Sequence, residues 1–103
     1  MNTVIPKEGD GATIGIGSDC YPATVIEVSK NGRTVTVQYD LATPIKNFDF
    51  YTNQVYSFEC NWRGAIEVWT LRNHGRYVRK GLKKGSGFYI SFNGRRKYSD
   101  PSF

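Results

Sequence analysis

The sequence lacks most of the features by which membrane proteins and enzymes are recognised. Its 103 residues include two cysteines, one histidine and one methionine, and no long apolar run. A membrane-spanning helix needs about 20 predominantly apolar residues, so none is predicted. Residues 1–7 have no apolar core of the kind that marks a signal peptide. We therefore expect a cytoplasmic protein with no membrane partner.

Catalytic and metal-binding motifs are also missing. In a reducing cytoplasm Cys20 and Cys60 are expected as free thiols. Structural zinc takes about four Cys or His ligands at short spacings, whereas the chain has three such residues, none so spaced. There is no P-loop and no Gly-x-Ser-x-Gly. We predict no metal, no cofactor, no catalytic residue and no enzymatic activity; the alternative is a small metal-free hydrolase centred on His74.

The charge is distributed unevenly along the chain. The net charge is +5, but residues 1–71 contain five basic and eight acidic residues, and residues 72–103 contain nine basic and one acidic. A field of one sign steers an oppositely charged partner. The basic third therefore predicts a phosphate-bearing partner, nucleic acid or nucleotide, or an acidic protein surface. The alternative is that it only aids solubility or pairs with the acidic part of the chain.

The candidate ligand-binding residues are the cations of the basic third together with aromatic residues. Basic side chains hold phosphates and aromatic faces stack on bases. Lys83 and Lys84 lie in a glycine-rich loop whose backbone N–H groups suit a phosphate. Trp62 stands in a predicted turn beside Arg63, as an exposed anchor for a partner or as a lid over the barrel mouth. The predicted site comprises Trp62, Arg72, Arg76, Tyr77, Arg79, Lys80, Lys83, Lys84, Arg95, Arg96, Lys97 and Tyr98.

The apolar pattern is typical of short antiparallel strands. Such strands are predicted over residues 21–29, 33–39, 54–59, 65–72, 76–80 and 88–92. No stretch has the apolar period of a helix. We predict one all-β domain over residues 1–103, a small antiparallel SH3-like barrel or sandwich with a C-terminal β-meander. Residues 1–10 are predicted to be partly mobile.

Local signals define the expected turns and core. Asn31-Gly32 predicts a type I′ hairpin turn, in which both residues have positive φ. Pro44 disfavours central-strand pairing, so residues 40–53 are interpreted as a connecting loop. Alternation points Val35, Val37 and Tyr39 into the core, and likewise Phe88, Ile90 and Phe92. Trp69 is expected in core packing, with a stacking platform as the alternative.

Residues 20–28 followed by residues 34–40 resemble the first hairpin of Tudor-like and KOW-like SH3-type barrels. In those barrels an aromatic-x-Ala-x-Val strand turns into a Val-x-Val-x-aromatic-Asp strand. The resemblance implies binding of nucleic acid or modified peptides, sometimes in an aromatic cage. It places Tyr21 and Tyr39 where cage aromatics could lie, with simple packing as the alternative.

A second resemblance extends along most of the chain. It is carried by residues 9–13, 17–19, 23–27, 70–72, 75–81 and 95–98, and it is to a group of small uncharacterised phage and prophage proteins. It implies a mobile-element origin and a location in the host cytoplasm. The second hypothesis is therefore a counter-defence protein that blocks a host immune protein by direct contact or sequesters a nucleotide signal. An exposed edge strand would also allow a homo-oligomer.

Overall fold

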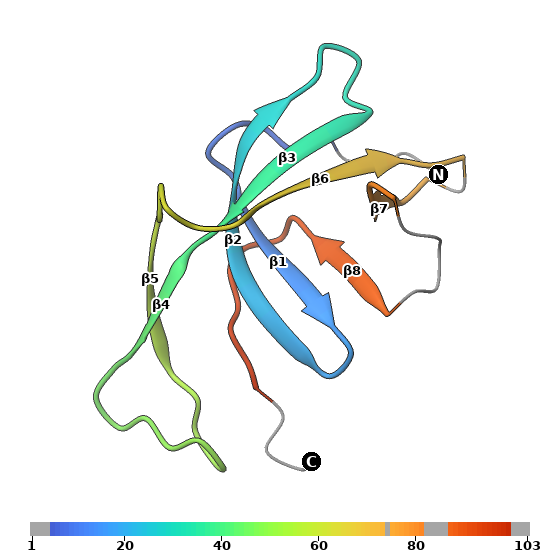
Figure 1. Cartoon of the computed structure of the whole chain (residues 1–103). Helices are drawn as coiled ribbons and strands as arrows, with labels where there is room; N and C mark the ends of the chain where they lie inside the picture. Colours follow the sequence, from blue (N-terminus) through green and yellow to red (C-terminus); the bar gives the residue numbers. More distant parts are fainter. Residues whose placement is uncertain (1–4, 74, 82–86, 100–103) are drawn as a thin grey trace.

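The computed structural model describes residues 5–73, 75–81 and 87–99, and within them the chain forms eight strands and no helix. The prediction of an all-β domain is confirmed (Figure 1). The strands are β1 (Gly11–Ile16), β2 (Asp19–Val28), β3 (Thr34–Tyr39), β4 (Leu41–Pro44), β5 (Tyr56–Glu59), β6 (Ile66–Leu71), β7 (Tyr77–Arg79) and β8 (Phe88–Ser91).

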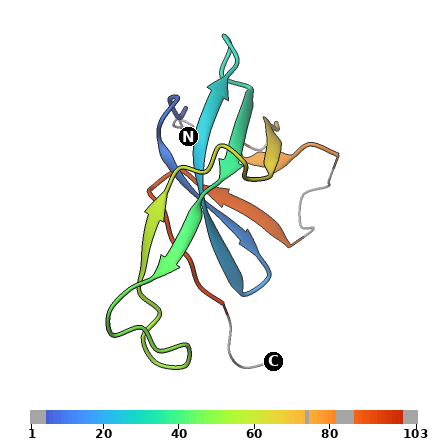
Figure 2. The same ribbon diagram turned by 60° about the vertical axis from the view of Figure 1, so that its left-hand side comes forward.

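The strands form two sheets. Six of them make an antiparallel sheet in the order β7-β6-β3-β2-β1-β8, and β7 comes close to β8, so that the sheet is nearly closed into a barrel. β4 and β5 pair only with each other. Together with the loop that joins them they make an arm, residues 41–59, which projects from the barrel (Figures 1 and 2). The molecule is thus a small barrel with one β-hairpin arm.

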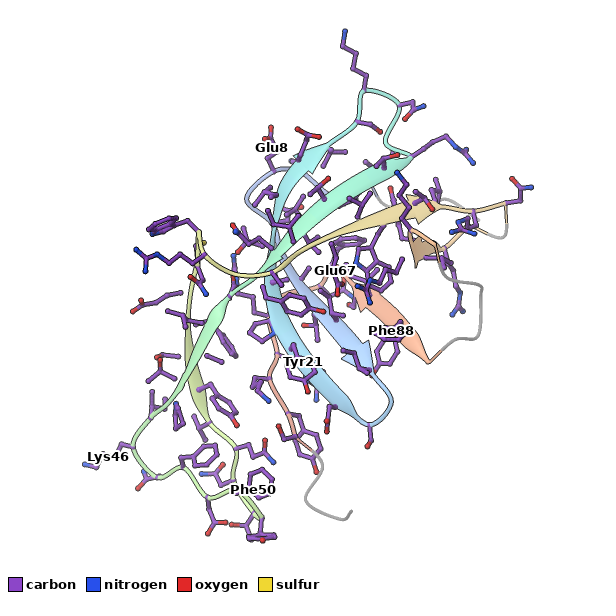
Figure 3. All side chains as sticks on the ribbon, in the orientation of Figure 1. Glu8, Tyr21, Lys46, Phe50, Glu67 and Phe88 are labelled. Carbon is purple, nitrogen blue, oxygen red and sulfur yellow. The ribbon has the colours of Figure 1, made fainter. Side chains whose placement is uncertain are left out.

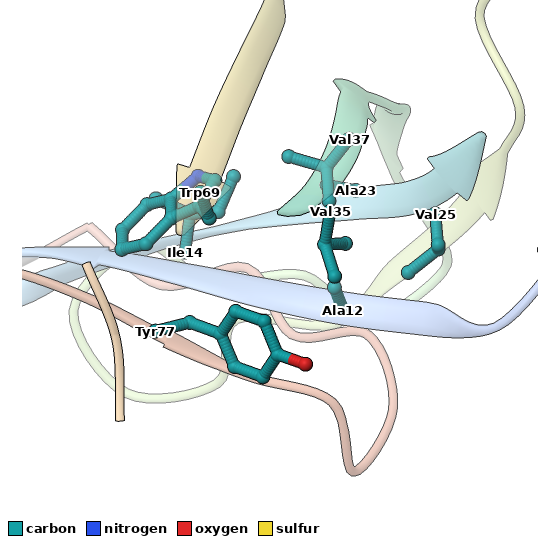
Figure 4. Close-up of a cluster of buried hydrophobic side chains, with 8 residues drawn as sticks. All are labelled: Ala12, Ile14, Ala23, Val25, Val35, Val37, Trp69 and Tyr77. Carbon is teal, nitrogen blue, oxygen red and sulfur yellow. The ribbon is translucent and has the colours of Figure 1, made fainter. Parts of the chain in front are cut away.

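The core lies inside the barrel and follows the predicted alternation. Val35 and Val37 on β3 are fully buried, and Trp69 on β6 is buried beside them (Figure 4). Phe88, Ile90 and Phe92 pack against this core, as expected. Trp69 is therefore a packing residue and not a stacking platform. The core cluster consists of Ala12, Ile14, Ala23, Val25, Val35, Val37, Trp69 and Tyr77.

A buried carboxylate is held within this core. Glu67, which is 9% exposed, accepts hydrogen bonds from the Tyr39 hydroxyl at 2.8 Å and from Trp69 Nε1 at 3.2 Å. Arg79 Nε lies 3.6 Å from the same carboxylate. Burial, followed by the hydrogen bond to Glu67, raises the pKa of Tyr39 above its ordinary value. Each polar atom of this group thus has a partner, as burial requires.

The turn between β2 and β3 differs from the prediction. Gly32 has a φ of 72°, but Asn31 does not have positive φ, so the type I′ assignment is wrong. Asn31 Oδ1 instead accepts hydrogen bonds from the Ser29 hydroxyl at 2.8 Å and from Arg33 N at 3.0 Å. The asparagine side chain therefore stabilises a longer loop, in which only the glycine needs positive φ.

Two strands lie outside the predicted set. β1 is not among the predicted strands. It contains two glycines, Gly11 and Gly15, which strand propensity disfavours and which lie under side chains from distant parts of the chain. β4 falls in residues 40–53, so the loop interpretation is wrong for residues 41–44. Pro44 is tolerated because β4 ends there, paired with Tyr56 in a sheet of only two strands. Of the N-terminal stretch, Gly9 N donates to Val25 O at 2.8 Å, while residues 1–4 lie outside the described residues.

Candidate ligand-binding site

The segment after β8, residues 94–99, joins the barrel to the arm (Figures 1 and 2). Tyr98 pairs with Cys20 of β2 through two backbone hydrogen bonds of 2.9 and 3.0 Å. Ser99 N donates to Gln54 Oε1 at 2.9 Å, and Gln54 Nε2 donates to Ser99 O at 2.6 Å. We call residues 94–99 the C-terminal segment. It pairs with β2 at Cys20, beyond the part of β2 (residues 23–28) that pairs with β3.

A pocket of about 240 Å³ lies between β1, β8 and the C-terminal segment. Its walls offer two guanidinium groups, two tyrosines and three hydroxyl side chains, together with the buried free thiol of Cys20. Tyr89 is 52% exposed and Tyr98 is 39% exposed. The side chains that give the pocket this chemistry are those of Thr13, Ser18, Tyr89, Ser91, Arg95, Arg96 and Tyr98.

Arg95 holds the C-terminal segment against the barrel. Its Nε lies 2.7 Å from Asp40 Oδ2, and its Nη2 donates to Thr24 Oγ1 at 2.9 Å. The Thr24 hydroxyl donates to Asp40 Oδ1 at 2.6 Å. The Asp40 side chain is fully buried, so its charge requires this partner. An ideal Cβ at Gly11 would lie 2.8 Å from Arg95 Nη1, which explains the glycine there.

Arg96 is the second cation of the pocket. Its side chain is exposed and forms an ion pair with none of the described residues. It lines the same pocket as Tyr98 and Tyr89. A phosphate at this position would meet an accessible guanidinium, the group that pairs best with phosphate oxygens.

Two other predicted cations are used inside the molecule. Arg79 pairs with Glu67, and its Cζ lies 5.4 Å from the Phe88 ring centroid. Lys97 Nζ lies 4.6 Å from the Tyr21 ring centroid and donates to Ser99 Oγ at 2.6 Å. The ion pairs of Arg79 with Glu67 and of Arg95 with Asp40 show that carboxylates from earlier parts of the chain partly neutralise the basic third.

The hairpin of β6 and β7 gathers a further basic group, at a place distinct from the pocket. Arg72 N donates to Arg76 O at 2.9 Å, and Arg33 Nη2 donates to Leu71 O at 3.2 Å. Arg33 was not among the predicted site residues. Tyr77 is 8% exposed and belongs to the core, with its hydroxyl donating to Gly32 O. Its ring is therefore not offered to a ligand.

The remaining predicted residues are spread over the surface. Lys80 is exposed just beyond β7. Trp62 is 78% exposed in the turn between β5 and β6, with Arg63 Cζ 4.6 Å from its ring centroid, so it does not act as a lid. Lys83, Lys84 and His74 lie outside the described residues.

Tyr21 and Tyr39 contact each other, with ring centroids 6.3 Å apart and an edge-to-face angle of 82°. Lys97 covers Tyr21 and also approaches Tyr56, at 5.8 Å from that ring centroid. The ring of Tyr21, one of the two predicted cage aromatics, is therefore already in contact with a cation of the chain itself.

The pocket brings together Arg95, Arg96 and Tyr98 from the predicted set. Sequence reasoning did not select Tyr89, although its outward position in the alternating stretch 88–92 was a usable signal. It also missed Asp40 and Glu67, the partners of two predicted cations, because these contacts join distant parts of the chain.

Comparisons with protein families, with curated proteins and with solved structures find no match to this chain. Among the described residues, no cluster of three or more His, Cys, Asp or Glu side chains is arranged to hold a metal ion. Within residues 5–73, 75–81 and 87–99 no helix has the length and apolarity to cross a membrane.

Proposed function

We propose that the protein is a non-enzymatic binding module for a phosphate-bearing ligand, a nucleic acid or a nucleotide. The observation that carries the proposal is the pocket that exposed Arg96 lines together with the exposed residues Tyr89 and Tyr98. A guanidinium and aromatic faces at one concave place are the groups that hold phosphates and bases.

The two arginines of the pocket have different roles in this proposal. Arg96 would receive a phosphate, because its charge is accessible, whereas Arg95 mainly holds the C-terminal segment through Asp40. The hydroxyls of Ser18 and Ser91 at the pocket wall supply further hydrogen-bond donors for phosphate or sugar oxygens. The net charge of +5 adds a long-range attraction that increases the association rate.

A salt titration tests this proposal. Fluorescence anisotropy measures the binding of a labelled single-stranded oligonucleotide to the native protein and to Arg96→Ala at a series of salt concentrations. We expect Arg96→Ala to weaken binding about tenfold, as loss of a charge-assisted hydrogen bond implies. The slope of log K against log salt should fall by about 0.7, the value for one single-strand phosphate contact.

The matched control is Lys46→Ala, which removes the same charge from an exposed position on the arm. Lys46 and Phe50 lie at the far end of the arm, away from Tyr21 and Phe88 on the barrel (Figure 3). An equal loss in both variants would mean that net charge alone drives binding and that the pocket is not the site.

A second candidate function rests on Trp62. We propose, as the alternative, a counter-defence inhibitor of phage origin that blocks a host immune protein by direct contact. The stacked and exposed pair Trp62 and Arg63 supports it, since these residue types dominate interface hot spots. A partner retained by native protein and by Arg96→Ala but lost with Trp62→Ala would favour this function over the first.

A further inference from the structure

The ring of Tyr89 lies flat on the backbone of β1. Gly15 is the direct cross-strand partner of Tyr89. An ideal Cβ at Gly15 would lie 1.8 Å from Tyr89 Cζ and 2.2 Å from each Cε carbon. A point in the plane of the ring and beyond its edge would be much farther from both Cε carbons than from Cζ. The nearly equal distances to these three carbons therefore place the point above the ring. Gly15 is therefore the residue that allows the ring to lie face-on against the strand.

The face of this ring that β1 does not cover is open, and Tyr89 is one of the residues that line the pocket. Tyr89 keeps 52% of its surface exposed although one of its faces is covered by β1. Tyr98, at 39% exposed, and Arg96 line the same pocket. A planar group placed on Tyr89 would thus have a fixed aromatic surface beneath it and a cation within the same pocket.

The size of the pocket restricts the ligand. About 240 Å³ is less than the roughly 300–1,000 Å³ typical of pockets for drug-sized ligands, so it holds one ring system with its immediate substituents. In a duplex each base is stacked on its neighbours and its faces are not accessible. Only an unpaired base can lay a face on Tyr89, and every base has such a face.

We propose that Gly15 and Tyr89 form a stacking platform for an unpaired nucleobase whose phosphate is held by Arg96. This inference rests on the proposed function and narrows its ligand to single-stranded nucleic acid or a free nucleotide. Tyr89 contacts the base, and Gly15 is a positioning residue that acts through the ring of Tyr89.

Three probes with equal numbers of phosphates test the platform. They are a short single strand of mixed sequence, an abasic strand of the same length, and a duplex of half that length. We expect the single strand to bind native protein about tenfold more tightly than the abasic strand, as stacking of one base implies. We expect the duplex to bind no better than the abasic strand. Competition by a nucleoside monophosphate separates a free nucleotide from a strand as the ligand.

Variants locate the effect. Tyr89→Leu keeps an apolar side chain but removes the aromatic face, so it should lower affinity for the single strand to that for the abasic strand. Tyr51→Leu is the control, because Tyr51 is 75% exposed on the arm. Gly15→Ala should act like Tyr89→Leu by displacing the ring; if that variant does not fold, Tyr89→Leu alone still decides.

The outcomes separate the two proposals. Equal affinity of native protein for the single and abasic strands would overturn the platform while leaving phosphate binding in place. An unchanged preference for the single strand in Tyr89→Leu would also overturn it. Failure of all three probes and of the nucleoside monophosphate to bind would overturn the proposed function as well.

Discussion

Arg95 Nε lies 2.7 Å from Asp40 Oδ2, and this contact attaches the C-terminal segment to the connection between β3 and β4. The carboxylate is fully buried and also accepts a hydrogen bond from Thr24. One of two consecutive arginines is thereby committed to the fold. Its neighbour Arg96 carries its charge at the surface of the pocket.

Arg95→Met should destabilise the protein by about 2–4 kcal/mol, because it leaves the buried charge of Asp40 without its partner. The partial exposure of Arg95 screens the pair and keeps the effect below that of a fully buried one. Urea unfolding measures the change. Arg96→Met should alter stability by less than about 0.5 kcal/mol, as expected for a surface substitution. Equal stabilities for the two variants would contradict the structural role of Arg95.

Alkaline pH should destabilise the fold through Tyr39. Burial and the hydrogen bond to Glu67 raise its pKa, so the folded state keeps Tyr39 neutral where the unfolded chain ionises. The stabilisation is complete below pH 10 and is lost as pH rises above it, with a slope of up to about 1.4 kcal/mol per pH unit for one proton.

Urea midpoints measured across this range test the assignment. Tyr39→Phe should show a shallower decline than native protein, although it is less stable at neutral pH. The raised pKa values of Tyr21, Tyr56 and Tyr77 act in the same direction and leave a residual slope. An unchanged slope in Tyr39→Phe would show that Tyr39 is not the group responsible.

Substitution of the two tryptophans should affect the free energy of unfolding very differently. Trp69→Ala removes a fully buried ring and should cost about 3–5 kcal/mol. Trp62→Phe should leave stability within about 0.5 kcal/mol, since Trp62 is 78% exposed. It should also shift fluorescence emission to shorter wavelength, because only the buried Trp69 remains. A red-shifted emission from this variant would contradict the burial of Trp69.

Lys97 should stabilise the C-terminal segment locally. Lys97→Met removes the cation–π contact with Tyr21, worth about 0.5–1 kcal/mol at such a site. Hydrogen exchange at the Tyr98 amide, which donates to Cys20 O, should become a few times faster. Lys46→Met serves as the control on the arm. Unaltered exchange would mean that the backbone pairing with β2 holds the segment alone.

Local patterns predicted the barrel well where one face of a strand is buried. The alternation of Val35, Val37 and Tyr39 identified β3 and its core face correctly. The prediction failed for β1, whose glycines are explained by what covers them: Gly11 lies under Arg95, and Gly15 lies under Tyr89. Those contacts come from residues about 75–85 positions later in the chain, and strand propensity does not describe them.

The candidate site was predictable in composition but not in geometry. The sequence identified Arg96 and Tyr98 as residues that suit phosphates and bases. It did not show that Arg79 and Arg95 pair with Glu67 and Asp40, because such pairs depend on the register and closure of the sheet. Arg95 and Arg96 count equally toward the net charge, but Arg95 pairs with a buried carboxylate whereas Arg96 is exposed.

The most direct test of the binding site is a titration of ¹⁵N-labelled protein with a short single-stranded oligonucleotide, followed by amide chemical shifts. We predict shifts concentrated around the pocket, at residues 13, 18, 20, 89, 91, 93–96 and 98. Shifts confined to the Trp62 turn or to the β6–β7 hairpin, or no shifts at saturating ligand, would contradict the account.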